Sequence, residues 1–310
     1  MSNGSLPFRL AHLSDLHATS AAPRRASELA SKRLLGWLSW MRKRRFEHMG
    51  FVLEALIEDL PASGARHVAI SGDMTHIGLP SEIAEAARWL ARIGPPEAVS
   101  LVPGNHDAYA PSATADPWAP WGPYLESRDA AGLAIGPGVG ADRFPTARRL
   151  GPVAIVGASS ARATLPLLAT GRLGDAQRER LASVLRALGD EGAFRVLVVH
   201  HPPLPVGQSR RRQLDDAAAL RAVLARSGAE LVLHGHTHRT SFAELSGPDG
   251  PIPVVGVPSS SSIGTKPERR ARYHVYCIDR GADGRFTVSY EVRGFDPATR
   301  RFAHEGEGVL

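Results

Sequence analysis

Cysteine is almost absent from this sequence of 310 residues, in which Cys277 is the single thiol. One thiol cannot form an internal disulfide, which is typical of a reducing compartment, so we expect a cytoplasmic protein. The sequence has no apolar run near the ~18 residues that a membrane-spanning helix needs. Residues 1–9 lack the apolar stretch of a signal peptide. Neither a disulfide-stabilised secreted domain nor an integral membrane protein is predicted.

Lysine and aromatic residues are scarce as well. The lysines are Lys32, Lys43 and Lys266, so arginine supplies 34 of the 37 basic residues, and the net charge is +6. Arginine carries a planar fork of donors that matches phosphate, although a genome rich in G and C explains an excess spread over the whole chain. Aromatic residues make up 6% of the sequence and form no stacking platform, so we expect no nucleic-acid partner.

Apolar residues, in contrast, make up 43% of the sequence, which is ample for a buried core. Helical spacing predicts helices over residues 47–60, 81–93, 174–188 and 214–227. Residues 108–145 predict a long surface loop with one helical turn near 124–129. Apolar runs predict strands over residues 10–13, 67–70, 99–102, 153–156, 194–199, 231–233, 253–257, 272–278 and 285–292. This alternation, followed by late strands, predicts an α/β fold with two stacked sheets and helices outside.

Five short polar motifs come at or near the ends of these predicted strands. Carboxyl ends of strands are where ligands bind in open α/β sheets, so we expect the five motifs to meet in space. Imidazole and carboxylate groups together suit zinc, iron or manganese. The motifs are Asp15-Leu16-His17, Gly72-Asp73, Gly104-Asn105-His106-Asp107, His200-His201-Pro202 and Gly235-His236-Thr237-His238. Because they span most of the chain, we expect one domain over residues 1–295, followed by a tail over 296–310.

The order and residue types of the motifs resemble the calcineurin-like metallophosphoesterases, over about residues 8–257. The closest likeness is to class III cyclic nucleotide phosphodiesterases. The resemblance implies an αββα sandwich of two mixed sheets. It also implies a centre of two metal ions, which can be manganese, iron or zinc. It implies that one metal is held by Asp15, His17 and His238, the second by Asn105, His200 and His236, and that Asp73 bridges them.

The resemblance also implies how the reaction runs. A hydroxide between the metals attacks phosphorus, and Asn105 helps to stabilise the phosphate oxygens. His106 protonates the leaving group, and Asp107 orients the ring of His106. His201, next to the ligand His200, is interpreted as a wall of the substrate pocket.

Two further features bear on the substrate. His76 stands three residues after Asp73, where class III enzymes usually have an acid, and this departure puts the cyclic nucleotide assignment in doubt. Arg210, Arg211 and Arg212 follow the fourth motif, and they are either forks for substrate phosphate or part of a solvated loop.

Residues 24–45 form a basic insertion, longer than the corresponding segment of a minimal family member. Leu34, Trp37, Leu38 and Met41 follow helical spacing beside Trp40, and residues 42–45 are all basic. A basic amphipathic helix is typical of a contact with an anionic membrane, here the inner membrane face. A lid over the site, a helix packed on the body and a homodimer contact remain alternatives.

The sequence thus predicts a binuclear metal-dependent phosphodiesterase acting on cyclic nucleotides or other small phosphodiesters. The insertion favours an alternative, hydrolysis of a lipid-linked or nucleotide-sugar pyrophosphate such as UDP-diacylglucosamine. An alternative of another class is a scaffold that keeps the fold without catalysis.

Overall fold

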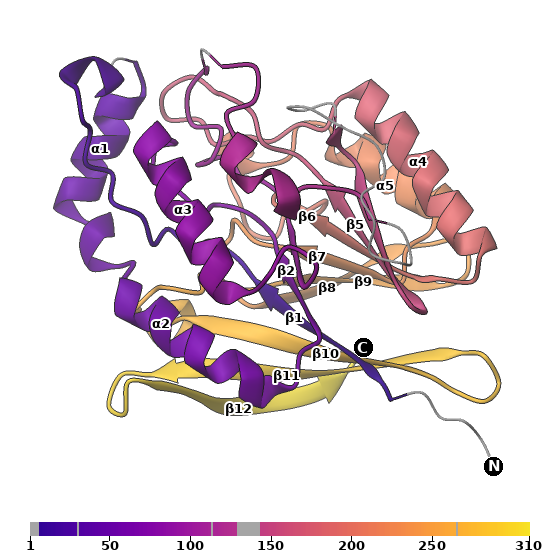
Figure 1. Cartoon of the computed structure of the whole chain (residues 1–310). Coiled ribbons are helices and arrows are strands. Elements are labelled where there is room, and N and C mark those ends of the chain that lie inside the picture. The colour runs from indigo at the N-terminus through magenta and orange to yellow at the C-terminus, as the bar shows by residue number, and fades with distance from the viewer. Residues whose placement is uncertain (1–5, 30, 113, 129–142, 265) are drawn as a thin grey trace.

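The computed structural model describes residues 6–29, 31–112, 114–128, 143–264 and 266–310. Two mixed sheets of six strands each are stacked between layers of helices (Figure 1). The predicted αββα sandwich is therefore confirmed.

The first sheet has the strand order β12-β11-β10-β1-β2-β3. Strands β1, β2 and β3 run parallel, and β10 joins β1 in antiparallel fashion with Leu10 opposite Tyr276. The segments that follow β1, β2 and β3 therefore emerge at one edge of the sheet. The strands are β1 (Phe8–Leu13), β2 (His67–Ile70), β3 (Val99–Leu101), β10 (Arg272–Arg280), β11 (Phe286–Asp296) and β12 (Arg301–Val309).

The second sheet has the order β4-β5-β6-β7-β9-β8. Strands β5, β6, β7 and β9 run parallel, and β4 and β8 close the two edges in antiparallel fashion. Every residue of β5, β6 and β7 is buried, which explains why all but Arg195 and His234 of their residues are apolar or glycine. The strands are β4 (Thr146–Leu150), β5 (Val153–Ala158), β6 (Phe194–Val199), β7 (Leu231–His234), β8 (Ser241–Ser246) and β9 (Pro251–Gly256).

The α-helices cover the outer faces of the sandwich. α1, α2 and α3 lie on the side of the first sheet, and α4 and α5 lie on the side of the second (Figure 1). The main hydrophobic core lies between the two sheets and under α2 and α3, and a second core lies beneath α4 and α5. No helix in the described part of the chain is long and apolar enough to cross a membrane. The helices are α1 (Arg33–Arg42), α2 (Gly50–Asp59), α3 (Pro80–Ile93), α4 (Asp175–Asp190) and α5 (Ala217–Ser227).

Short 3₁₀ turns connect several of these elements. The described part of residues 24–45 contains three helical pieces: η1 (Ala26–Leu29), α1 and the start of η2 (Arg44–Phe46). The others are η3 (Leu60–Ser63), η4 (Ala119–Tyr124), η6 (Arg210–Arg212) and η7 (Pro267–Arg269).

The C-terminal segment corrects one prediction, because residues 296–310 are not a tail. They form β12, which pairs with β11 at the edge of the first sheet. Phe302 packs between Tyr273 and Phe295, and it is the one fully buried residue of β12. An edge strand with one buried side chain has no apolar run, so the sequence pattern did not indicate it.

Edge strands and loops account for the other differences. β4 and β8 are half-exposed edge strands of low apolar content, and no strand was predicted there. The predicted loop over 108–145 contains η4, which ends where the predicted turn at 124–129 begins. Residues 129–142 of this loop lie outside the described residues.

Candidate metal centre

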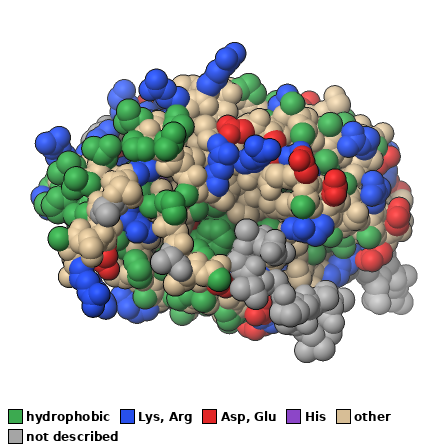
Figure 2. Space-filling model, turned by 90° about the horizontal axis from the view of Figure 1, so that it is seen from above, with side chains coloured by type: hydrophobic (Ala, Val, Ile, Leu, Met, Phe, Trp, Pro, Cys, Tyr) green, Lys and Arg blue, Asp and Glu red, His purple; other side chains and the backbone are tan. Residues whose placement is uncertain are grey.

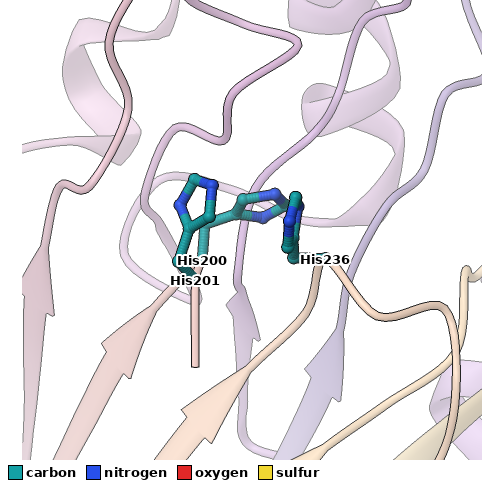
Figure 3. Close-up of side chains that lie close together, drawn as sticks. All are labelled: His200, His201 and His236. Carbon is teal, nitrogen blue, oxygen red and sulfur yellow. The ribbon is translucent and has the colours of Figure 1, made fainter. Parts of the chain in front are cut away.

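The five polar motifs meet at one edge of the sandwich, between the two sheets. Asp15 and His17 follow β1, Asp73 follows β2, and Asn105 and His106 follow β3. His200 follows β6 of the second sheet, and His236 and His238 follow β7. Figure 3 shows His200, His201 and His236 grouped just beyond the strand ends. Each sheet therefore supplies one side of the candidate centre.

Backbone strain is concentrated at the same place. Among the described residues, eight residues other than glycine have positive φ, and five of these are predicted metal ligands. Such conformations are uncommon for residues with a Cβ and persist where the surrounding structure enforces them, often at functional sites. The five are Asp15 (50°), His17 (42°), Asp73 (56°), His236 (66°) and His238 (52°).

The first group of ligands is Asp15, His17 and His238. Nε2 of His238 lies 3.2 Å from Oδ1 of Asp15, and Nε2 of His17 lies 4.0 Å from the same oxygen. This oxygen is buried and accepts no hydrogen bond from any described residue. Burial raises the pKa of Asp15, but the nearby His238 outweighs it and holds that pKa well below its usual range. An ionised, orphaned carboxylate oxygen facing two imidazoles fits a cation site.

Asp73 lies between the two groups of ligands. Its Oδ2 is 3.8 Å from Nε2 of His17 and 3.3 Å from Nε2 of His200. Its Oδ1 accepts a 2.7 Å hydrogen bond from the backbone N–H of His106, which fixes the carboxylate. A Cβ at Gly104 would overlap Asp73, so glycine is required where these two strand ends approach each other.

The second group contains His200, Asn105 and His236. Nε2 of His200 lies 3.2 Å from Oδ1 of Asn105, and the rings of His200 and His236 are 5.0 Å apart. Burial lowers the pKa of His200, but Asp73 reverses this and raises it to about 9. The backbone N–H of His236 donates to Asp15, which ties the second sheet to the first group. The donors are imidazoles, carboxylates and one amide, a set that fits two divalent cations.

His201 lies beside the second group, with its ring 5.0 Å from that of His200 and 4.3 Å from that of His236. Its Nδ1 is 2.7 Å from Oγ of Ser160, and its Nε2 donates to the carbonyl of Ala169 at 3.1 Å. His200, His201 and His236 nevertheless have ring nitrogens close enough to form a further candidate metal group. With both of its ring nitrogens engaged, His201 is better suited to support the wall than to bind a cation.

His106 is held differently from the prediction. Its Nδ1 donates to the carbonyl of His76 at 2.5 Å, so this carbonyl orients the ring. Asp107, predicted to do so, instead accepts hydrogen bonds from Thr75 and from the N–H of Gly104. Burial and the neighbouring Asp73 raise the pKa of Asp107 to about 7. Asp107 therefore stabilises the loop that carries His106 and does not orient the imidazole ring of His106.

A cavity of about 250 Å³ opens above the candidate centre. Arg44 of η2 enters it, with Nη1 3.2 Å from both ring nitrogens of His106. Burial lowers the pKa of Arg44. The pKa of His106 is also lowered, first by burial and second by the positive charge of Arg44. His48 also lines the cavity, with its ring 4.7 Å from that of His17. Arg44 was predicted as part of the basic insertion and not at the site, and His48 was not among the predicted site residues.

The predicted substrate residues divide into two sets. Arg212 lines the cavity, and its carbonyl accepts a 2.9 Å hydrogen bond from Nε2 of His236. Arg210 and Arg211 are exposed on η6 and do not line it. His76 is buried behind His17, with the two rings stacked 5.2 Å apart, and it does not line the cavity either.

A comparison with protein-family models shows to which family this chain belongs. The family model described as calcineurin-like phosphoesterase matches residues 8–240. The chain belongs to this family. Calcineurin-like phosphoesterases use a dimetal centre, and the Asp and His clusters described above are the candidates for it in this member.

Solved structures agree with this assignment at the level of the fold. A dimetal phosphatase from Danio rerio superposes with a TM-score of 0.59 at 12% identity, over 99% of each chain. The purple acid phosphatase PPD1 from yellow lupin gives 0.56 at 13% identity, over 94% of this chain and 52% of that one. A comparison with curated proteins gave no match. At such identities the likeness to these phosphatases concerns the fold alone.

Proposed function

We propose that this calcineurin-like phosphoesterase hydrolyses phosphodiester bonds with two bound metal ions. The observation that carries the proposal is the position of Asp73 Oδ2, which faces His17 on one side and His200 on the other. One carboxylate oxygen between two imidazole groups suits a ligand shared by two cations. When bound, two cations at ~3.5–4 Å separation stabilise the attacking and leaving oxygens of a displacement at phosphorus.

The residues of the chain then hold the substrate and supply the proton. The carbonyl oxygen of Asn105, 3.2 Å from Nε2 of His200, would help to hold the second metal, and its amide nitrogen would remain a donor for a phosphate oxygen. His106 donates through Nδ1 to a fixed carbonyl, and its Nε2 lies 3.2 Å from Nη1 of Arg44. Nε2 is therefore the ring nitrogen that can serve the leaving group once a bound phosphate engages the guanidinium. Protonation of the leaving oxygen from this nitrogen is its proposed role.

Arg44 is the proposed clamp for the phosphate. Its guanidinium is half-buried, and it takes part in none of the ion pairs between described residues. Arg195, in contrast, pairs with Glu230 at 2.6 Å. A half-buried cation without a counter-charge is costly, and a phosphate oxygen in the cavity removes that cost.

A substrate assay tests the proposal. Chelated protein is reloaded with manganese, zinc or iron and given bis(p-nitrophenyl) phosphate, p-nitrophenyl phosphate, a cyclic nucleotide and a lipid-linked pyrophosphate. We expect hydrolysis that depends on added metal and favours the diester over the monoester. A strong preference for the monoester contradicts the diester assignment, and metal binding without any hydrolysis favours the scaffold alternative.

A second proposal concerns the surface beside the site, because an apolar patch extends beyond α1. Trp37 and Trp40 face inward and pack on Ile77 and Leu79, which contradicts their expected contact with a bilayer. Leu34 and Leu35 instead point outward, with 46% and 50% of their surface exposed.

The patch continues into a second segment. Leu165 and Leu167 are 73% and 78% exposed. Nζ of Lys32 ties this segment to α1 by donating to Thr164 and to the carbonyl of Leu168. Figure 2 shows hydrophobic side chains gathered on the side of α1, with Lys and Arg around them. We propose that this apolar patch rests on an anionic membrane surface, which would bring a lipid-linked substrate within reach.

We expect the protein to bind vesicles rich in phosphatidylglycerol at low salt and to be released by high salt, because salt screens the basic rim. The variant L34S/L35S/L165S should lose most of this binding in cosedimentation. Val309→Ser is the matched control, since Val309 is 78% exposed on β12, far from the patch. Absence of binding at low salt, or equal binding by the variant and wild type, would remove the membrane contact.

A further inference from the structure

A second cavity, here called the cationic groove, lies between η2 and η7. It adjoins the cavity above the candidate centre, here called the metal pocket. The volume of the groove is about 420 Å³. Phe46 and Ile263 form its apolar part, and Glu47 is the single acid in its lining. Lys43, Glu47 and Arg269 line both the groove and the metal pocket, so the two cavities share a wall. A ligand bound in the metal pocket therefore lies next to the groove.

The walls of the groove are built by backbone contacts between distant segments. The N–H of Ile263 donates to the carbonyl of Glu47 at 2.9 Å, and the N–H of Met49 donates to Ser261 at 3.0 Å. These bonds hold the chain after η2 against the chain before η7. The two segments that form the groove are therefore held together by the fold.

The charge of the groove is unbalanced. Its lining carries four cations, Arg42, Lys43, Lys266 and Arg269, against the one carboxylate of Glu47. Within the described part of the chain, none of the four takes part in an ion pair, whereas Arg272 close by pairs with Glu305. Cations gathered in a concave surface without acidic partners raise the local potential and attract anions.

We propose that the cationic groove binds a second anionic group of the substrate, beyond the phosphate held in the metal pocket. This inference rests on the proposed function. A flat ring fits against Phe46, which is 61% exposed, and Ile263 extends the apolar surface. The substrate class is then a phosphate ester whose ring-bearing part carries a further phosphate, such as a phosphorylated nucleotide. A simple diester with one charge would leave the groove unused.

Equilibrium binding tests this with two probes that differ by one phosphate. Metal-loaded protein is titrated calorimetrically with thymidine 5′-monophosphate and with thymidine 3′,5′-bisphosphate. We expect the bisphosphate to bind at least about tenfold more tightly, the effect of two or three partly exposed charge contacts. The variant R42S/K266S should lose this preference, because both residues line the groove and neither lines the metal pocket.

The control removes the same charge elsewhere. R24S/R25S takes away two exposed arginines that line neither cavity, and it should keep the preference. Equal affinity of wild type for the two probes overturns the inference, as does an equal loss in both variants, which would indicate long-range attraction alone. Lys266→Gln repeats the measurement should the double variant unfold. A tight, groove-dependent bisphosphate complex without hydrolysis of any p-nitrophenyl ester would instead overturn the proposed function and leave the groove standing.

Discussion

Replacing Asp73 by alanine should leave the protein folded but without its metal ions, and it should lower phosphoesterase activity at least about 10³-fold. The reason is geometric, since one oxygen of Asp73 faces both His17 and His200. Removing it takes a ligand from both cations at once and leaves two groups of imidazoles with no carboxylate between them. Elemental analysis of the purified variant should find well under one tightly bound metal per chain.

The fold should survive this change, because Asp73 contributes little to the core besides its hydrogen bond from the N–H of His106. Thermal melting of the metal-free proteins checks this. Asp279→Ala is the matched control, a carboxylate lost from an exposed position of β10. Two tightly retained metals in the Asp73 variant would show that this residue does not bridge them.

His106→Ala should keep the metals and the melting temperature but lose about 10²–10⁴ in turnover of esters with poor leaving groups. With Nδ1 engaged by the carbonyl of His76, the other ring nitrogen is the one that can serve the leaving oxygen. Nitrophenolate needs little protonation, so the loss should be much smaller for p-nitrophenyl esters. Steady-state kinetics on alkyl and nitrophenyl esters of the same phosphate measure the difference.

Arg44→Gln separates the proposed proton donation by His106 from the proposed phosphate binding by Arg44. Burial and Arg44 both lower the pKa of His106, which disfavours the imidazolium in the free protein. A bound phosphate offsets the charge of Arg44, which removes the second of these two causes and favours the protonated ring. Arg44 serves the phosphate itself, so its loss should slow good and poor leaving groups alike. If His106→Ala also slowed esters with good and poor leaving groups equally, His106 would not be the acid and would be only a positioning residue.

The sequence by itself determined the fold class and the family resemblance, because both depend on local order along the chain. A buried strand appears as an apolar run, and the residue after it is delivered to the carboxyl edge of a sheet. The candidate ligands from Asp15 to His238 all lie within a few residues of a strand end. Their convergence was therefore expected from the strands alone, whereas the positive φ angles of five of them became visible only in the structure.

The tertiary structure decided everything that depends on which distant segments touch. Nothing in the local pattern distinguishes Arg44 from Arg42 or Arg45, yet only Arg44 reaches His106, because α1 turns Trp37 and Trp40 inward and η2 then points toward the pocket. The cationic groove likewise exists because the segment after η2 pairs with the segment before η7. Even Asp107, adjacent to His106, contacts Thr75 instead of the ring. Such contacts follow from helix packing and loop geometry across tens to hundreds of residues, and no local periodicity encodes them.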